Sequence, residues 1–465
     1  MHNSTRKMIG MDMTDGKLLP SLVRFAIPLL LANLIQQLYS SVDMMIVGKV
    51  VGSTGTVGVS IGGALPSLLT GIGMSFGNAA QICSAQMCGA RERNKAGDMG
   101  CSVLWAMLLI STAASGCSIV VCEPFLRILN CPEDAFEQAS RYMRMASLGL
   151  PFVFGYNALS GVMRGMGESQ KPLIFILISA VSNVFMDIML VIVIPLEAMG
   201  SAIATVIAEA MAFIASLVYI SLTDMRQVFH IRENGLKMKT CYLLPVARLG
   251  IPLCLQYGCI QFSQLICTSW VNGFGMLASA TTSVGNKVAQ IINVITASIN
   301  GSTGSVVAQN LGAHKYGRVR QTVYAALGLC LIICTAEFAV SILFPTQLFS
   351  LFTGDPDTIA FGKPYMYITL ITFFLSALQG PYTAVITGSG NTMLSFAYGI
   401  LDGIVLRLGI AYVLAYVCNM GVVGYWYGNA LAHLGPVVIG LVYFYRGSWA
   451  ERRLVSDDIR ESEDG

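Results

Sequence analysis

Twelve runs of mostly apolar residues divide the chain, and each is long enough to cross a bilayer as one helix. A membrane-spanning helix needs roughly 17 to 25 such residues, because its backbone must satisfy its own hydrogen bonds inside hydrocarbon. The expected spans are 22–47, 57–87, 100–122, 138–163, 172–194, 200–221, 246–272, 279–309, 321–344, 361–386, 393–417 and 421–445. The predicted fold class is therefore an all-α integral membrane protein.

The composition excludes a soluble globule. Hydrophobic residues make up 55% of the 465 residues and charged residues only 11%, whereas soluble domains carry about 25% charged residues. The net charge of +3 does not favour nucleic-acid binding, and the four histidines lack metal-ligand spacing. Phosphate-binding, nucleophile-elbow and dinucleotide motifs are absent, so we expect neither an enzyme nor a cofactor.

The cysteines lie mostly inside apolar runs, where they behave as small hydrophobic residues. Cys122 and Cys131 flank one short loop. They either pair in an oxidising exterior or remain two free thiols, and the sequence leaves both alternatives open.

Basic residues predict the orientation of the chain in the membrane. Lys and Arg gather before the first span, in the loops after the second, fourth, sixth and eighth spans, and in the tail. Arg91, Arg93 and Lys95 illustrate one such loop, whereas the loops on the opposite side carry few basic residues. By the positive-inside rule, both termini are expected to be cytoplasmic.

An internal repeat divides the chain into two halves. The segment RFAIPLLLANLIQQ from Arg24 matches RLGIPLCLQYGCIQ from Arg248 at an offset of 224. The segments AQMCGA from Ala85 and AQNLGA from Ala308 match at an offset of 223. Each half holds six spans, so we expect two parallel-repeat lobes. The predicted divisions are an N-terminal segment 1–20, a first lobe 21–222, a linker 223–244, a second lobe 245–446 and a tail 447–465.

Several charged residues lie inside the expected spans, where each costs roughly 2.5 to 3.5 kcal/mol to insert. The acids are Asp43, Asp187, Glu209, Glu337 and Asp402, and the bases are Lys287 and Arg407. The first lobe has three acids and no base at depth, whereas the second has two residues of each sign. We therefore expect compensating pairs, or a shared cavity, in the second lobe. The repeat also places Cys267 opposite Asp43, so the second lobe lacks that acid.

Helical spacing predicts a polar site in the first lobe. Two spans carry polar residues at every fourth position, namely Ser179, Asn183 and Asp187 in one and Ser201, Thr205 and Glu209 in the other. A rise of about 1.5 Å per residue puts Asp43, Asp187 and Thr205 each roughly 6 to 11 Å from the outer end of its span. Groups at similar depth on three helices can converge on one pocket.

Two neighbouring carboxylates in a low dielectric cannot both be ionised cheaply, so one of them is expected to hold a proton. Alternatively Na⁺ neutralises them, with the amide of Asn183 and the hydroxyl of Thr205 as further oxygen ligands. Pro28 below Asp43 is either a hinge or an ordinary packing kink. Glu209 either joins the site or pairs with a polar neighbour.

The chain resembles the multidrug and toxic compound extrusion (MATE) transporters, in particular their DinF-like bacterial branch, from Leu18 to Tyr445. The most specific segments are QQLYSSVDMMIVG at Gln36, LGLPFVFGYNALSGVMRGMGES at Leu148 and SNVFMDIMLVIVIPLEAMGSAIATV at Ser182. The resemblance implies a cation site at Asp43, Asn183, Asp187 and Thr205, and a substrate cavity that includes Gln36, Tyr39 and Asn157, with Glu209 as a further candidate. The NorM-like branch carries acids in spans seven and ten, which this chain lacks.

The resemblance also implies a V-shaped pair of six-helix lobes in the cytoplasmic membrane of a bacterium. Such a protein would export cationic or amphipathic small molecules against an inward H⁺ or Na⁺ gradient. We expect it to act as a monomer among membrane lipids, without a nucleic-acid partner.

Two other functions compete with efflux. A flippase for lipid-linked sugars, a related fold, would need several Arg or Lys residues for a pyrophosphate, and the first lobe has none deep in its spans. A membrane receptor or enzyme is disfavoured by the lack of metal or nucleophile clusters and of a soluble module.

Overall fold

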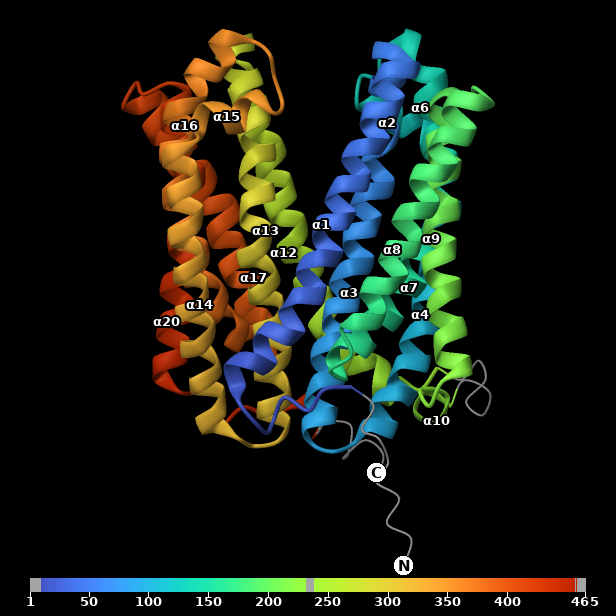
Figure 1. Cartoon of the computed structure of the whole chain (residues 1–465), viewed down its shortest axis with the longest axis vertical. Coiled ribbons are helices and arrows are strands. Elements are labelled where there is room, and N and C mark those ends of the chain that lie inside the picture. The colour runs from blue at the N-terminus through green and yellow to red at the C-terminus, as the bar shows by residue number, and fades with distance from the viewer. Residues whose placement is uncertain (1–9, 231–237, 456, 458–465) are drawn as a thin grey trace, which may run out of the picture. The chain divides into compact units, whose positions relative to one another are not determined.

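The computed structural model describes residues 10–230, 238–455 and 457, and the regular structure of these residues is entirely helical (Figure 1). Eleven of the described helices are long and apolar enough to cross a membrane. The pair α6 (Glu133–Ser147) and α7 (Leu150–Gly165), bent by 41° at the break between them, makes a twelfth span when counted as one. The predicted all-α membrane fold is confirmed. Three of the basic residues that predict the orientation lie outside the described residues, namely Arg6, Lys7 and Arg460. The same is true of residues 231–237 in the predicted linker.

The described chain forms two compact units, and the first comprises residues 10–12, 31–230, 238–250, 455 and 457. Within it α3 packs against α7 and α4, α8 packs against α9, and α2 packs against α6. Besides α6 and α7, its elements are most of α1 (Leu18–Val50), α2 (Gly52–Gly62), α3 (Ala64–Gly89), α4 (Arg93–Val120), α5 (Cys122–Ile128), α8 (Gln170–Asp187), the π-helix η1 (Ile188–Val193), α9 (Glu197–Leu222) and α10 (Arg226–Phe229).

The second unit comprises residues 13–30 and 251–454. Its α13 packs against both α14 and α16, and Trp426 and Tyr365 lie in its buried core. Its elements are most of α12 (Thr240–Asn272), α13 (Met276–Gly312), α14 (Tyr316–Leu343), α15 (Pro345–Ser350), α16 (Pro356–Gly388), α17 (Thr392–Ile400), η2 (Leu401–Leu408), α18 (Gly409–Tyr412), η3 (Val413–Val417), α19 (Val422–Leu431) and α20 (Leu434–Arg446).

Helices α1 and α12 each contribute residues to both units. Helix α1 continues through Pro28, and the change of unit falls after Leu30. In α12 the change falls after Gly250, close to Pro252. A proline lacks the N–H of an interior helical hydrogen bond and so weakens the helix locally. In each of these long helices the change of unit therefore falls within three residues of a proline.

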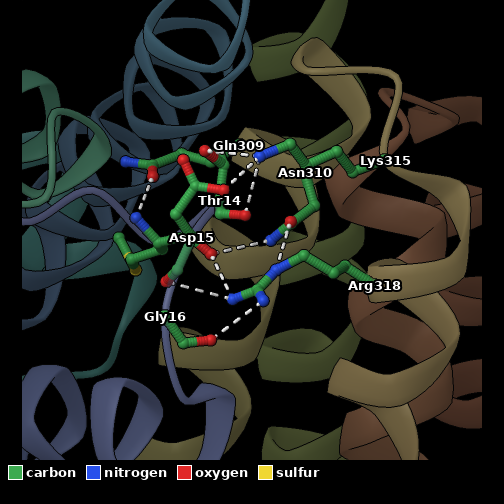
Figure 2. A network of polar contacts seen from close by, with 8 residues as sticks. Thr14, Asp15, Gly16, Gln309, Asn310, Lys315 and Arg318 are labelled. Atoms are coloured by element: carbon green, nitrogen blue, oxygen red, sulfur yellow. Dashed lines mark hydrogen bonds and ion pairs between the residues drawn. The ribbon is translucent and has the colours of Figure 1, made fainter.

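The segment before α1 is held by side chains of the second unit (Figure 2). The backbone N–H of Met13 donates to Oε1 of Gln309 at 3.2 Å. Lys315 donates to the carboxylate of Asp15 at 2.6 Å, and Arg318 donates to the carbonyl of Gly16 at 3.0 Å. These contacts fix the entry of the chain into its first span.

Gln86 and Gln309 occupy equivalent positions in the two AQ motifs of the repeat. Oε1 of Gln86 accepts a hydrogen bond from the backbone N–H of Val455 at 2.9 Å, as Gln309 accepts one from Met13. Each unit therefore uses the same glutamine to hold a segment near one end of the chain.

All thirteen cysteines are free thiols. The sequence leaves open whether Cys122 and Cys131 form a disulfide, and in the structure they are two free thiols. The thiol of Cys122 lies 3.6 Å from the hydroxyl of Ser140.

Candidate cation site

Asp187 lies where α8 changes from an α-helix into the π-helix η1. Short π-helical turns occur frequently at functional sites. The residue is 0% exposed, and neither carboxylate oxygen has a hydrogen-bond partner within the described chain. A buried acid without a partner is costly, so this position favours binding of a positive species.

The carboxyl group of Asp43 from α1 lies beside that of Asp187. The two are close enough to share a hydrogen bond when one of them carries a proton. Asp43 also accepts a hydrogen bond from the hydroxyl of Ser201 on α9 at 2.6 Å. Hydrogen bonds to an ionised acceptor are short and strong, so Ser201 orients Asp43. Two acids that lie far apart in the sequence thus meet within one unit.

Asn183 and Thr205 lie next to this pair along α8 and α9. Asn183 precedes Asp187 by one helical turn on the same face, and its Nδ2 lies 3.5 Å from the hydroxyl of Thr205. Oδ1 of Asn183 is buried and has no partner among the described residues. The amide oxygen of Asn183 and both oxygens of Asp187 thus form a set of acceptors without donors.

Tyr142 of α6 belongs to this site, although the sequence did not predict it. Its hydroxyl hydrogen-bonds with Ser201, and it lies within electrostatic range of Asp43, Asp187 and Glu209. Its ring joins a buried apolar cluster formed with Val47, Val59, Ala198 and Ala202. Apolar surroundings lower the local dielectric and strengthen every charge interaction beside them. A single tyrosine in an apolar run gives no signal of this role.

Glu209 lies against the start of α7. Its Oε2 occupies the space where a side chain on Gly149 would begin, and Gly149 immediately precedes α7. The N-terminus of a helix carries partial positive charge, which favours a carboxylate there. The break between α6 and α7 thus creates a site for this acid within the span.

The other residues predicted for the site differ in how close they lie to Asp43 and Asp187. Tyr39 is half-buried, hydrogen-bonds through its hydroxyl with the exposed Gln36, and lies within electrostatic range of Asp43 and Glu209. Asn157 donates from its amide to the carbonyl of Val153 in its own helix at 2.9 Å. Pro28 is buried in the part of α1 that belongs to the second unit. Of these residues, Tyr39 is the one placed near the acid pair.

The second unit contains one of the expected compensating pairs. Asp402 and Arg407 are each 4% exposed, and Nη2 of Arg407 lies 3.2 Å from Oδ1 of Asp402. Arg407 also donates to Oδ1 of Asn429 at 2.7 Å. Glu337 accepts a hydrogen bond from Thr296, and Lys287 is exposed.

The MatE family model matches residues 28–189 and 252–413 of the chain, and these two stretches start at the prolines of the repeat. The chain is 27% identical over 462 residues to the probable multidrug resistance protein YoeA of Bacillus subtilis (strain 168), covering 98% of this chain and 99% of that protein. It is 25% identical over 458 residues to the probable multidrug resistance protein YpnP of the same strain, covering 97% and 100%.

Among solved structures, the crystal structure of MATE in complex with MaD3S superposes with a TM-score of 0.88 at 18% identity. The match covers 97% of this chain and 100% of that one. At this identity the match shows a common fold and no more.

Proposed function

Because the chain belongs to the MatE family of multidrug efflux transporters, we propose that it exports cationic or amphipathic compounds in exchange for H⁺ or Na⁺. The observation that carries this proposal is the buried, unpartnered carboxylate of Asp187 beside Asp43. A carboxyl pair without a neighbouring base needs an external cation when it is closed off from water. Occupancy by that cation then becomes a condition for a change of conformation.

The coupling between the ion and the substrate follows from the small number of acidic groups in the first unit. A small cation at Asp43 and Asp187 neutralises the charge that would otherwise attract a cationic substrate. The two occupants therefore lower each other's affinity, and the state that releases one favours the other. Each net charge that moves inward gains about 2.3 kcal/mol per 100 mV of membrane potential. The potential therefore drives export when more coupling charges enter than substrate charges leave, and the ion's concentration gradient drives it in every case.

Different atoms serve the two candidate ions. A proton would be shared between the carboxyl groups of Asp43 and Asp187. Na⁺ would use the same carboxylates together with Oδ1 of Asn183 and the hydroxyl of Thr205, because hard cations prefer oxygen ligands. The substrate would contact Tyr39 and Glu209, together with Gln36 one turn before Tyr39 on α1 and Asn157 on α7.

We also propose that both termini lie on the cytoplasmic side of the membrane. Pro28 is proposed as the hinge of the transport cycle. Its missing N–H lets α1 bend, and the change of unit after Leu30 supports a hinge here. Pro28→Ala is expected to slow export and leave ion binding unchanged. Unchanged export would show that the proline serves packing alone.

The test is export of a fluorescent cationic dye by everted membrane vesicles, with the pH gradient and the Na⁺ gradient varied separately. Asp43→Asn and Asp187→Asn are expected to abolish ion-driven export, because each removes one of the two carboxyl groups of the site. Asp134→Asn, which changes an exposed acid of α6, is the matched control and should export normally.

Wild-type export by both aspartate variants would show that this pair is not the coupling site. An absence of dye export together with movement of labelled lipid-linked oligosaccharide would favour a flippase instead.

A further inference from the structure

The second unit holds a buried carboxylate that the proposed function does not use. Glu337 of α14 is 4% exposed, and its Oε1 accepts a hydrogen bond from the hydroxyl of Thr296 on α13 at 3.0 Å. Its Oε2 is buried without a hydrogen-bond partner in the part of the chain that the structure describes. Among those same residues no Lys or Arg forms an ion pair with this carboxylate. The acid therefore lacks the internal neutralisation that Arg407 gives Asp402.

Two further oxygens without partners lie one helical turn away. Ser341 follows Glu337 by four residues on α14, is 0% exposed, and its hydroxyl has no partner among the described residues. Asn293 precedes Thr296 by three residues on α13, and its Oδ1 is likewise buried and unpartnered there. Residues three and four apart share one face of a helix. Each helix thus adds an oxygen on the face that carries the contact between Thr296 and Glu337.

The register of α13 and α14 places these oxygens at one level. The two helices follow each other in the chain, pack together and run antiparallel. A second contact, in which the thiol of Cys330 lies 3.6 Å from Oδ1 of Asn300, confirms that later residues of α13 meet earlier residues of α14. Asn293 lies one turn before Thr296, and Ser341 lies one turn after Glu337. Both residues are therefore on the same side of the contact between Thr296 and Glu337.

The chemistry of this set indicates its ligand. Glu337 Oε2 and Asn293 Oδ1 only accept hydrogen bonds, and the one donor, the Ser341 hydroxyl, can turn its lone pairs toward a ligand. Carboxylate, amide and hydroxyl oxygens are the ligands of hard cations, and a single carboxylate balances one positive charge. We propose that Glu337, Asn293 and Ser341 bind Na⁺ or a cation of the same class, at a site separate from Asp43 and Asp187.

The repeat shows that this site belongs to the second unit alone. At an offset of 223 the first unit has Ala114 in place of Glu337 and Gly73 in place of Thr296. The carboxylate and its hydroxyl partner are therefore both missing there. The proposal concerns a cation site in addition to the one in the proposed function, and it does not depend on dye export.

The test measures Na⁺ binding to the full chain in lipid nanodiscs in which Asp43→Asn and Asp187→Asn silence the first site. Retention of radioactive sodium, and a saturable rise of the unfolding midpoint with NaCl relative to choline chloride, are expected to persist in this double variant. Adding Glu337→Gln should abolish both effects, and adding Ser341→Ala should weaken them. Glu133→Gln, which changes an exposed acid, is the matched control and should leave both intact.

Two results would overturn the proposal. One is a double variant without Na⁺ retention, with an infrared band showing that Glu337 carries a proton instead. The other is Na⁺ retention that survives Glu337→Gln in a variant that elutes as a folded monodisperse protein. Loss of dye export in the double variant tests only the first site, so the two proposals fail independently.

Discussion

The two units repeat the same contacts with different chemistry. Two residue pairs of the first unit reappear in the second at an offset of 224. The hydrogen bond between Ser201 and Asp43 corresponds to one between Tyr425 and Cys267, and the contact between Asn183 and Thr205 corresponds to one between Arg407 and Asn429. The helix geometry is thus shared, whereas the charges are not.

The substitutions explain why only the first unit is suited to ion exchange at this place. At the same offset Ala411 stands where the first unit has Asp187, and Arg407 stands where it has Asn183. The second unit therefore carries a tethered guanidinium, which Asp402 neutralises at 3.2 Å. In the first unit the acids have no tethered partner, so a mobile cation can occupy and leave the site. The second unit therefore has a permanent charge pair between Arg407 and Asp402, whereas the acids of the first unit can pair only with an exchangeable cation.

The strongest test of this contrast replaces Asp187 with the alanine that the second unit has. Asp187→Ala is expected to reduce ion-driven dye export to that of vesicles lacking the protein. The unfolding midpoint should be equal to or above that of the wild type, because a buried unpaired acid costs roughly 2.5 to 3.5 kcal/mol. Export at wild-type rates, or a large loss of stability, would show that Asp187 serves the fold and not the exchange.

The opposite outcome is expected in the second unit. Arg407→Ala leaves Asp402 buried without a partner, which is expected to lower the free energy of unfolding by about 3 to 5 kcal/mol. The double variant Asp402→Ala/Arg407→Ala should regain most of that stability, since it removes both charges. Thermal unfolding of the purified proteins measures both effects. A single variant as stable as the wild type would contradict internal neutralisation by this pair.

A smaller effect is expected from the hydroxyl that orients Asp43. Hydrogen bonds to charged groups contribute about 1.5 to 3 kcal/mol, so Ser201→Ala should lower export about tenfold or more. Ser201→Thr keeps the hydroxyl and should retain most of the activity. The control is Ser216→Ala, which removes a buried hydroxyl that donates to Phe213 within the same helix. Tyr425→Phe, at the equivalent place in the second unit, should leave export near the wild-type rate.

Much of this arrangement is predictable from the sequence, because charge inside hydrocarbon is costly and helical spacing is regular. The cost of insertion identified the intramembrane acids, and depth predicted that Asp43 and Asp187 can converge, as the structure places them. The repeat predicted that Cys267 replaces Asp43. The all-α fold could also be predicted, since it depends on the order of long apolar runs. The family was predictable only from the resemblance of the segments at Gln36, Leu148 and Ser182.

Other features depend on packing that no local pattern encodes. Ser201 was recognised as part of a polar stripe, but its bond to Asp43 depends on how α9 is rotated against α1. Tyr142 reaches the site because α6 packs against α9, which carries Ser201. The π-helix after Asp187 has no distinctive residues. Lys315 and Arg318 likewise look like ordinary loop charges, yet they bind the segment before α1.

The smallest expected effect concerns the third acid of the first unit, which the second unit replaces with His433 at an offset of 224. Gly149→Ala puts a methyl group where Oε2 of Glu209 lies and moves this carboxylate away from the start of α7. Interactions with a helix terminus contribute about 0.3 to 1 kcal/mol, so export should fall roughly two- to fivefold. Gly116→Ala, where an added carbon meets nothing within 4 Å, is the control. If the two variants export equally, the end of α7 does not position Glu209, and the difference between the units at this place would lie in charge alone.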